Sequence, residues 1–366
     1  MARAARHAIA EPAQRIRFCR GSGGVRIAHA AHGEGPPLVV VSCWLSHLQH
    51  DWESPVWRHF LEDLGAVSTL IRYDERGFGL SAWDVDDFSL EARVADLGAV
   101  VDDLGLERFA LLGMSGGSPV ALEYALQHPD RVTRMVVYGG SGVGAPHYFP
   151  DPPAEEVAFR AMIEAGWAKR DPIFRRVFTT MFIPEASEPQ LSWFDELQRT
   201  STSAENMLRS RIERQRIDLR DRLGGLTMPI LVLNAVDDRN VPFEEAHELA
   251  SLVPGARLVP LQSSNHILLA DEPAWQTFIQ EVTAFLEPDR MATSHHRSNA
   301  IRTLSGRERQ IIELAAAGAS NLEIAATLQL SVRTVERHLS NAYLKLGVSG
   351  RAARTAAVAS LLRADT

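Results

Sequence analysis

Short apolar runs alternate with longer amphipathic stretches between residues 25 and 290 of the chain. The stretches at 90–104, 116–128 and 273–286 carry apolar residues at helical spacing. Strands that alternate with helices favour a mostly parallel sheet covered by helices on both faces, so the pattern predicts a doubly wound α/β fold. The runs that we expect to be buried strands are LVVVS (38–42), VSTLIRY (67–73), FALLGM (109–114), MVVYG (135–139), ILVLN (230–234) and RLVPL (257–261).

The alternation stops between residues 143 and 225, where no convincing strand pattern occurs. This segment is rich in aromatic residues and is divided by proline-containing joints at FPDPP, DPIF and IPEASEPQ. We therefore expect a helical cap at about 143–225. In a doubly wound fold such an insertion covers the carboxyl ends of the strands, where ligands bind.

The hydrophobic pattern changes again near the end of the last amphipathic stretch. Residues 287–299 (EPDRMATSHHRSN) are polar and have no apolar period, which predicts a linker at 290–299. The sequence then predicts two domains, an α/β domain over 1–289 and a small all-α, four-helix domain over 300–366. The four amphipathic patterns of the smaller domain lie at 305–317, 321–328, 332–346 and 351–362.

The charge of the chain is divided unevenly between these two parts. The 366 residues include 38 basic and 46 acidic ones, a formal net charge of −8. Residues 290–366 hold 11 basic and 5 acidic residues, a net charge of +6, which leaves −14 for residues 1–289. A basic module on an acidic body is typical of a part that faces nucleic acid, although a merely solvated basic tail has the same charge.

The remaining composition narrows the class of protein. Hydrophobic residues make up 45% of the chain and charged residues 23%, as is usual for globular proteins. With Cys19 and Cys43 as the two cysteines, a disulfide framework is not expected and the simplest location is the cytoplasm. No apolar run is long enough to cross a membrane, and no metal or cofactor motif occurs, so we expect no membrane span, metal or cofactor.

The segment GMSGG at 113–117 matches the G-x-S-x-G pattern around a nucleophilic serine. A predicted strand precedes Ser115 and a predicted helix follows it, as a strained strand-to-helix turn requires. A serine nucleophile needs a histidine base, which in turn needs a carboxylate to hold its tautomer. Asp237 and Asp238 follow one later strand, and His266 follows the next. Singly these residues could be a helix cap, turn residues and a surface histidine, but their common position after strands favours a catalytic triad.

Residues 25–289 resemble an α/β-hydrolase, because further segments are similar to motifs of that family. These segments are YDERGFGLSAW (73–83), DDRNVP (237–242) and NHILLADEP (265–273). The resemblance implies the role of each triad member: Ser115 as nucleophile, His266 as base, and Asp238, in preference to Asp237, as the orienting acid.

The resemblance also implies an oxyanion hole made by the backbone N–H groups of Trp44 and Gly116. The loop before Trp44 departs from the family, because Ser42 and Cys43 stand where the family usually has His-Gly. Aromatic residues of this loop and of the cap favour an apolar or aromatic ligand, although most of them are as readily explained as core. The residues expected to line the pocket are Trp44, His47, Met114, Trp167 and Trp193.

Residues 303–358 closely resemble the LuxR-type helix-turn-helix, which implies binding to double-stranded DNA as a homodimer. The matching segments are LSGRE, GASNLEIAATL, SVRTVERH and KLGV. The recognition helix is then expected at about 332–346, with Glu336, Arg337 and Ser340 facing bases. Glu308 is expected to hold the fold by pairing with an arginine of that helix. The other expected DNA-binding residues are Asn321, Arg333, Thr334 and Lys345.

Two functions are consistent with these features. The first is a ligand-responsive transcriptional regulator that senses a small apolar ester or lactone in the hydrolase pocket, with or without slow hydrolysis. The second is a serine hydrolase with an accessory DNA-binding domain. We favour the regulator, because a DNA-binding module gives an esterase no evident advantage, whereas a regulator gains a ready-made small-molecule pocket.

Overall fold

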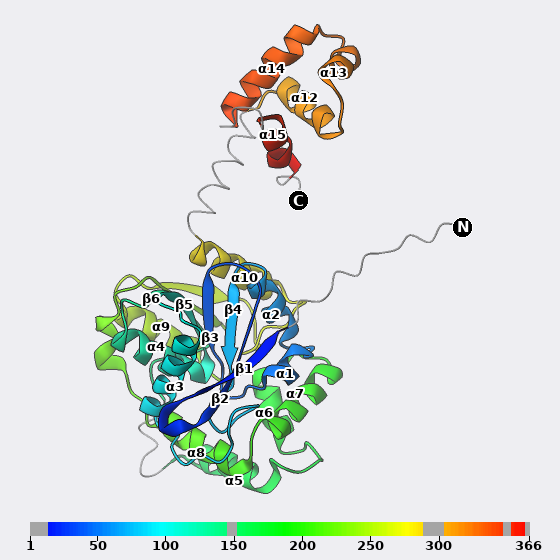
Figure 1. Cartoon of the computed structure of the whole chain (residues 1–366). Coiled ribbons are helices and arrows are strands. Elements are labelled where there is room, and N and C mark those ends of the chain that lie inside the picture. The colour runs from blue at the N-terminus through cyan, green and yellow to red at the C-terminus, as the bar shows by residue number, and fades with distance from the viewer. Residues whose placement is uncertain (1–13, 145–151, 288–303, 347–352, 363–366) are drawn as a thin grey trace. The chain divides into compact units, whose positions relative to one another are not determined.

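The computed structural model describes residues 14–144, 152–287, 304–346 and 353–362. The chain divides into two compact units, Met1–Leu286 and Glu287–Thr366, and each unit has its own hydrophobic core (Figure 1). The linker expected at 290–299 lies outside the described residues. No helix of the described ranges is long and apolar enough to cross a membrane.

An eight-stranded sheet forms the centre of the larger unit, in the order β1-β2-β4-β3-β5-β6-β7-β8. Strands β3 to β8 run parallel. At one edge β2 pairs antiparallel with β4, and β1 pairs antiparallel with β2. The predicted fold class is therefore confirmed. The strands are β1 (Arg15–Arg20), β2 (Arg26–His32), β3 (Pro37–Val41), β4 (Thr69–Tyr73), β5 (Phe109–Met114), β6 (Val132–Tyr138), β7 (Ile230–Ala235) and β8 (Arg257–Leu261).

Successive side chains of each strand point to opposite faces of the sheet, so the apolar strands have apolar side chains on both faces. Helices cover both faces. In β3, Val39 and Val41 enter the core on one face and Leu38 and Val40 the core on the other. Burial of such side chains stabilises the fold by roughly 1.5–3 kcal/mol each. One face carries α3 (Leu90–Asp103), α4 (Ser118–Gln127) and α9 (Phe243–Leu252), and the other carries α2 (Arg58–Gly65) and α10 (Pro273–Leu286). The short elements are η1 (Ser22–Gly24), α1 (Leu48–Trp52), η2 (Ser115–Gly117) and η4 (Arg220–Gly225).

Helices α5 to α8 follow β6 and precede β7 along the chain, in the segment where the sequence predicts a cap (Figure 1). Hydrogen bonds join this cap to loops that follow strands β4 and β8. The carbonyl oxygen of Ser201 accepts from the N–H of Gly79 (2.7 Å), and that of Phe182 accepts from the N–H of His266 (2.9 Å). Residues 145–151 lie outside the described residues. The cap helices are α5 (Ala154–Gly166), α6 (Arg175–Phe182), α7 (Glu188–Ser201) and α8 (Ala204–Gln215).

The described residues of the smaller unit form four helices, as the sequence pattern predicts. Serines begin three of them: Ser305 and Ser320 form capping boxes, and the hydroxyl of Ser331 accepts from the N–H of Thr334. The turn between the second and third helices passes through Gln329 in the left-handed region, with φ 53°. The helices are α12 (Gly306–Ala316), α13 (Asn321–Leu328), α14 (Val332–Lys345) and α15 (Ala353–Leu362).

The turn from β5 to α4 depends on two glycines. A β-carbon on Gly113 would lie 2.9 Å from the Cα atom of Ser118, and one on Gly117 would lie 2.3 Å from the carbonyl oxygen of Ser42. Backbone atoms cannot easily move away from such contacts. Glycine at these two positions therefore lets helix α4 and the loop after β3 approach the turn.

Gly117→Ala should lower the free energy of unfolding of the larger unit by about 1–3 kcal/mol, the usual cost of overpacking. The measurement is urea unfolding followed by tryptophan fluorescence, because all seven tryptophans lie in this unit. Gly224→Ala is the matched control, since a β-carbon there meets no heavy atom within 4 Å. Equal unfolding midpoints for the two variants would contradict the steric argument.

Candidate active site and DNA-binding helix

Ser115 stands at the turn between β5 and α4, as the G-x-S-x-G pattern predicts. Its φ of 48° lies in the left-handed region, which residues other than glycine rarely adopt and which recurs at functional turns. The side chain is buried but lines a cavity. Helix α4 begins directly after this turn, so its N-terminal end, which stabilises negative charge, lies beside the serine.

Asp238, and not Asp237, lies beside His266. Oδ2 of Asp238 is 2.6 Å from Nδ1 of His266, and both side chains are buried, whereas Asp237 is exposed. Oδ1 of Asp238 accepts from the backbone N–H groups of Asn240 (2.8 Å) and Val241 (3.0 Å). These bonds orient the carboxylate so that the proton of the neutral imidazole is on Nδ1. Nε2 is then left with the lone pair that a general base needs.

The base atom Nε2 of His266 faces the side-chain amide of Asn240, whose Nδ2 is 3.3 Å away. Among the described residues, Oγ of Ser115 has no hydrogen-bond partner. The structure thus brings the acid and the base together, while the serine lies at the cavity without a bond to the base. Catalytic hydrogen bonds often form only in the complex with substrate. The amide of Asn240 has to leave Nε2 before that atom can accept the proton of Ser115.

Tyr138, at the end of β6, holds the loop that carries His266. Its buried hydroxyl donates to the carbonyl oxygen of His266 (2.7 Å) and accepts from the N–H of Leu268 (3.0 Å). Tyr138 is not apparent as a site residue from the sequence, because a tyrosine in an apolar run is typical of a core position. The available signal is the hydroxyl itself, which needs a partner when the ring is buried.

The loop after β3 places Trp44 at the same cavity as Ser115 and Gly116. Cys43, which replaces the usual glycine, is buried, and its Sγ donates to the carbonyl oxygen of Leu45 (3.3 Å). Burial raises the pKa of the Cys43 thiol to about 12, so this side chain stays protonated and serves packing rather than nucleophilic chemistry. The roles of Trp44 and Gly116 as oxyanion donors stay predictions.

The cavity beside Ser115 has a volume of about 280 Å³, near the lower end for small-molecule sites. Polar side chains make up about half of its lining, and two of them are arginines. Of the five residues expected in the pocket, Trp44 is the one that lines it. The lining residues are Trp44, Ser115, Gly116, Pro119, Ser141, Val143, Gly144, Phe182, Met207, Ser210, Arg211, Arg214, Gln215, Asn240, Val241 and Glu245.

The other four expected residues do not line this cavity. Trp167 is buried, its indole N–H donates to a backbone carbonyl (3.0 Å), and its ring meets Trp44 edge-on. The ring of Trp193 stacks on a histidine, and a ring nitrogen of His47 caps helix α1. Met114 lines a second cavity. These aromatic residues contact other rings or cap a helix. The residues that line the cavity therefore do not support the expectation of an apolar ligand.

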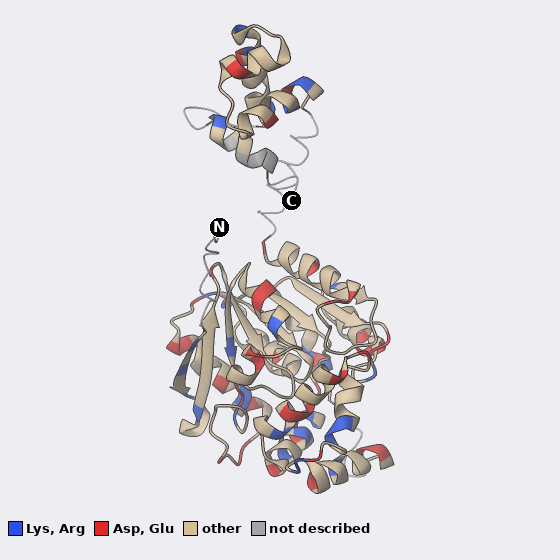
Figure 2. Cartoon of the chain, turned by 90° about the vertical axis from the view of Figure 1, so that its right-hand side faces the viewer, with Lys and Arg blue, Asp and Glu red and all other residues tan. Residues whose placement is uncertain are grey.

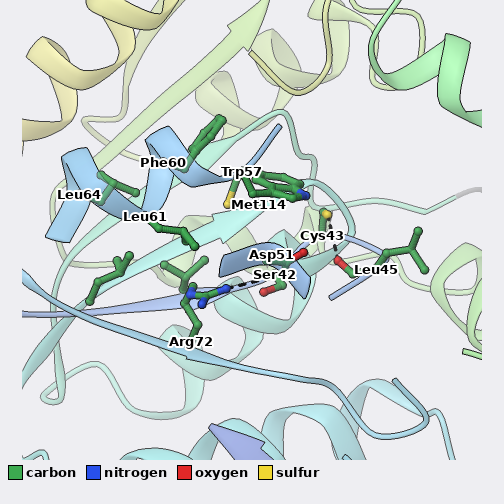
Figure 3. A pocket seen from close by; sticks show the side chains of 12 residues that line it. Ser42, Cys43, Leu45, Asp51, Trp57, Phe60, Leu61, Leu64, Arg72 and Met114 are labelled. Carbon is green, nitrogen blue, oxygen red and sulfur yellow. Dashed lines mark hydrogen bonds and ion pairs between the residues drawn. The ribbon is translucent and has the colours of Figure 1, made fainter. Parts of the chain in front are cut away.

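The second cavity lies behind the loop after β3 and has a volume of about 30 Å³ (Figure 3). A buried ion pair between Arg72 and Asp51, 3.6 Å apart, forms part of its wall. Burial raises the pKa of Asp51 to about 7, while the guanidinium of Arg72 opposes that rise. Such a volume holds roughly two water molecules, so it does not admit a substrate.

Two arginines of α8 face the larger cavity, and the sequence analysis did not identify them. Arg214 donates to the carbonyl oxygen of Gly116, and its Nη2 lies 2.5 Å from Oε2 of Glu75. Arg211 donates to Oε2 of Glu156 (2.7 Å). The signal in the sequence is a pair of arginines on the packed face of a cap helix. The residues of this face that line the cavity recur at helical spacing: Met207, Ser210, Arg211 and Arg214.

Helix α14 occupies the place predicted for the recognition helix. Val335 and Leu339 are buried on its inner face. The hydroxyl of Thr334 lies 2.8 Å from that of Ser331, so this residue takes part in the helix cap. The outer face is formed by four residues expected at DNA, all exposed: Arg333, Glu336, Arg337 and Ser340. Their positions on one face are consistent with entry of this helix into a groove.

Two other residues expected at DNA have partners within the smaller unit. Nζ of Lys345 donates to Glu308 (2.7 Å), and the amide oxygen of Asn321 accepts from Arg354 (2.6 Å). The partner of Glu308 in α14 is thus a lysine, not the arginine that was expected. Burial alone raises the pKa of Glu308, but the hydrogen bonds from Lys345 and Ser305 outweigh it and hold the pKa below its ordinary value.

The fold and the site define a class of protein, and family models agree with it. Residues 36–273 match the alpha/beta hydrolase fold family, and residues 302–358 match the bacterial regulatory proteins of the luxR family. The chain belongs to the alpha/beta hydrolase fold family and carries a LuxR-family helix-turn-helix domain after the hydrolase unit. Both resemblances seen in the sequence are therefore confirmed.

Individual relatives and solved structures extend this result. The "Putative carbamate hydrolase RutD" of Klebsiella pneumoniae (strain 342) is 26% identical over 257 residues, 69% of this chain and 94% of that protein. The 2-hydroxy-6-oxo-6-phenylhexa-2,4-dienoate hydrolase of Comamonas testosteroni is 28% identical over 220 residues, 57% of this chain and 76% of that protein. The esterase EaEST from Exiguobacterium antarcticum superimposes with a TM-score of 0.61 at 25% identity, over 74% of this chain and 98% of that one.

Asp238→Asn should lower kcat on 4-nitrophenyl acetate by about 10⁴-fold, because the amide favours the wrong tautomer of His266. The rate of 4-nitrophenolate release measures the effect. Asp237→Asn is the matched control and should leave kcat unchanged, since that side chain is exposed. Equal losses in both variants would mean that the loop, and not the carboxylate of Asp238, is what matters.

Proposed function

We propose that the protein is a transcriptional regulator whose hydrolase unit binds, and slowly cleaves, a small ester or lactone. One observation carries the proposal: an ordered acid–base pair and an elbow serine stand in the same chain as a LuxR-family module, which implies DNA binding. A simple esterase needs no such module, and a simple DNA-binding protein needs no acid–base pair 2.6 Å apart.

The chemistry proposed for the hydrolase unit is acyl transfer. Oγ of Ser115 attacks the carbonyl carbon of the ligand and gives its proton to Nε2 of His266. Asp238 stabilises the imidazolium, while the N–H groups of Trp44 and Gly116 stabilise the oxyanion. The imidazolium then protonates the leaving alkoxide, and water hydrolyses the acyl-serine by the same route in reverse order.

The signal is proposed to pass through the cap. The carbonyl oxygen of Phe182, at the end of α6, accepts from the backbone N–H groups of both His266 and Ile267 (2.9 and 3.2 Å). A ligand that shifts the histidine loop therefore also shifts α6. A tenfold change in DNA affinity requires a coupling free energy of about 1.4 kcal/mol between the two sites. The regulator is proposed to act in the cytoplasm as a homodimer on inverted half-sites.

A serine hydrolase with an accessory DNA-binding domain is the second candidate function. The bond between Asp238 and His266 favours it, because a protein that only binds its ligand has no need of a base held in a defined tautomer. The two candidates differ in one outcome, the response of DNA affinity to the ligand.

Ser115→Ala should lower kcat for ester cleavage by about 10³-fold or more. The change in DNA affinity on ligand binding should persist in this variant. Cleavage is measured on a panel of 4-nitrophenyl esters and aromatic lactones, and DNA affinity by fluorescence anisotropy on an operator selected from random sequence. Ser141→Ala is the control, because Ser141 lines the same cavity without belonging to the triad. If wild type cleaves none of these esters or lactones, the proposal that the hydrolase unit cleaves its ligand is wrong. If no cleaved ester alters DNA affinity, the second candidate replaces the regulator.

Arg337→Ala should weaken operator binding by about 1–3 kcal/mol and relax the preference at one base pair, because an exposed arginine of the recognition helix can read guanine. Sequence-specific and random DNA are compared by anisotropy at a fixed salt concentration. Arg309→Ala removes the same charge from α12 and should weaken binding equally on all sequences, if at all. Uniform weakening in Arg337→Ala would assign that residue to phosphate instead.

A further inference from the structure

We propose that the ligand of the hydrolase unit carries a carboxylate, and that Arg211 and Arg214 bind it. The inference rests on the proposed function, because the same cavity holds Ser115. It adds the charge class of the ligand and two residues that determine specificity.

The position of Arg214 brings positive charge close to the nucleophile. Its Nη1 donates to the carbonyl oxygen of Gly116, the residue that follows Ser115. Arg211 precedes it by three residues on α8, so both guanidinium groups lie on the face of the helix that lines the cavity. An anion bound here would place its ester or lactone carbonyl within reach of Ser115.

In the part of the chain that the structure describes, the ion pairs behind these arginines hold more guanidinium groups than carboxylates. Glu75 pairs with Arg214 and also lies 3.9 Å from Nε of Arg93. Glu156 pairs with Arg211 and also with Nε of Arg160 (2.8 Å). Four guanidinium groups therefore share two carboxylates, and Figure 2 shows basic and acidic positions interleaved on the lower helices of this unit. An anionic ligand would supply charge that the wall itself lacks.

The ionisation of Arg93 reflects its burial first and the neighbouring guanidinium of Arg214 second. Burial, and after it the neighbouring charge of Arg214, lower the pKa of Arg93 to about 9. A guanidinium loses affinity for its proton only where positive charge is costly. A carboxylate in the cavity would lower that cost.

A donor for a carboxylate remains available at the cavity. Arg211 uses Nε and Nη2 on Glu156, and its Nη1 has no partner within the part of the chain that the structure describes. Nε1 of Trp44 also has no partner there, but it is buried and has almost no accessible surface. Gln215 lines the same cavity, but its amide oxygen accepts from Arg160 (2.8 Å), so this side chain belongs to the wall. A planar carboxylate fits the forked donors of arginine, and charge-assisted bonds of this kind are stronger than neutral ones.

One carboxylate of the lining and one near it limit the positive potential without removing it. Glu245 is the acidic residue of the lining, and burial raises its pKa, which shifts it toward the neutral acid. Asp238 already accepts from His266 and from two backbone N–H groups. The surplus of positive charge is therefore confined to the wall that α8 forms.

The test uses two pairs of esters that differ only in charge. Mono(4-nitrophenyl) glutarate and its methyl ester carry the group on the acyl side, and 4-acetoxybenzoate and its methyl ester carry it on the alcohol side. Wild type should prefer the anionic member of at least one pair by about tenfold or more in kcat/KM. Arg211→Gln and Arg214→Gln should each lower this preference by about tenfold, near the lower end of the loss expected for a charge-assisted bond.

Arg160→Gln is the matched control. It removes the same charge from the same carboxylate, Glu156, but Arg160 is not among the residues that line the cavity. In every variant the affected glutamate keeps one guanidinium partner, so folding should persist, as tryptophan fluorescence can verify. A preference for the neutral ester in both pairs overturns the proposal. So does an unchanged preference in both cavity variants, or an equal loss in Arg160→Gln, which would indicate a general field.

Calorimetric binding of the same four esters to full-length Ser115→Ala separates this inference from the proposed function. Tighter binding of the anionic members, together with no cleavage by wild type, supports the carboxylate site and overturns the hydrolytic part of the proposed function. Cleavage of charged and neutral members at equal rates supports the hydrolytic part of the proposed function and overturns the carboxylate site. Binding of neither member of either pair overturns the carboxylate site.

Discussion

The strained turn at Ser115 sets the positions of the other groups at the cavity. A non-glycine residue with φ 48° persists only where its surroundings hold it, and here the loop after β3 presses on Gly117 from one side while α4 packs against Gly113 from the other. The same contacts bring Trp44 to the cavity. The carbonyl oxygen of the next residue, Gly116, then receives the guanidinium of Arg214, so the cap is bonded directly to the turn.

The site divides its tasks between the sheet and the cap. Loops at the carboxyl ends of β5, β7 and β8 supply Ser115, Asp238 and His266, whose relative positions follow from the parallel strands beneath them. The cap supplies charge through Arg211 and Arg214, and it is bonded to the histidine loop as well as to the turn. The residues of the cap can thus vary while the groups at the strand ends stay in place, which suits a fold whose functions vary through its insertions.

The smaller unit follows simpler rules, because its helices pack around one core of apolar residues at helical spacing. The inner face of α14 holds Val335 and Leu339, which leaves Arg333, Glu336 and Arg337 outside. The ion pair between Lys345 and Glu308 joins α14 to α12. Lys345, which was expected at DNA, therefore has a partner within the protein. A basic residue near a DNA-binding face is therefore not a DNA contact on the strength of its charge alone.

The sequence by itself determined the central parallel strands, the order of Ser115, Asp238 and His266, and the helix-turn-helix, because each is a local pattern or a short motif. It did not reveal β1 and β2, whose arginines and histidines interrupt any apolar run. Only the tertiary structure decided what lines the cavity. In the folded chain, aromatic residues expected to line the pocket, such as Trp44 and Trp167, contact each other. Arg214 donates to the carbonyl oxygen of Gly116, 98 residues away in the sequence. Contacts of that range depend on how the cap packs, and no local period records them.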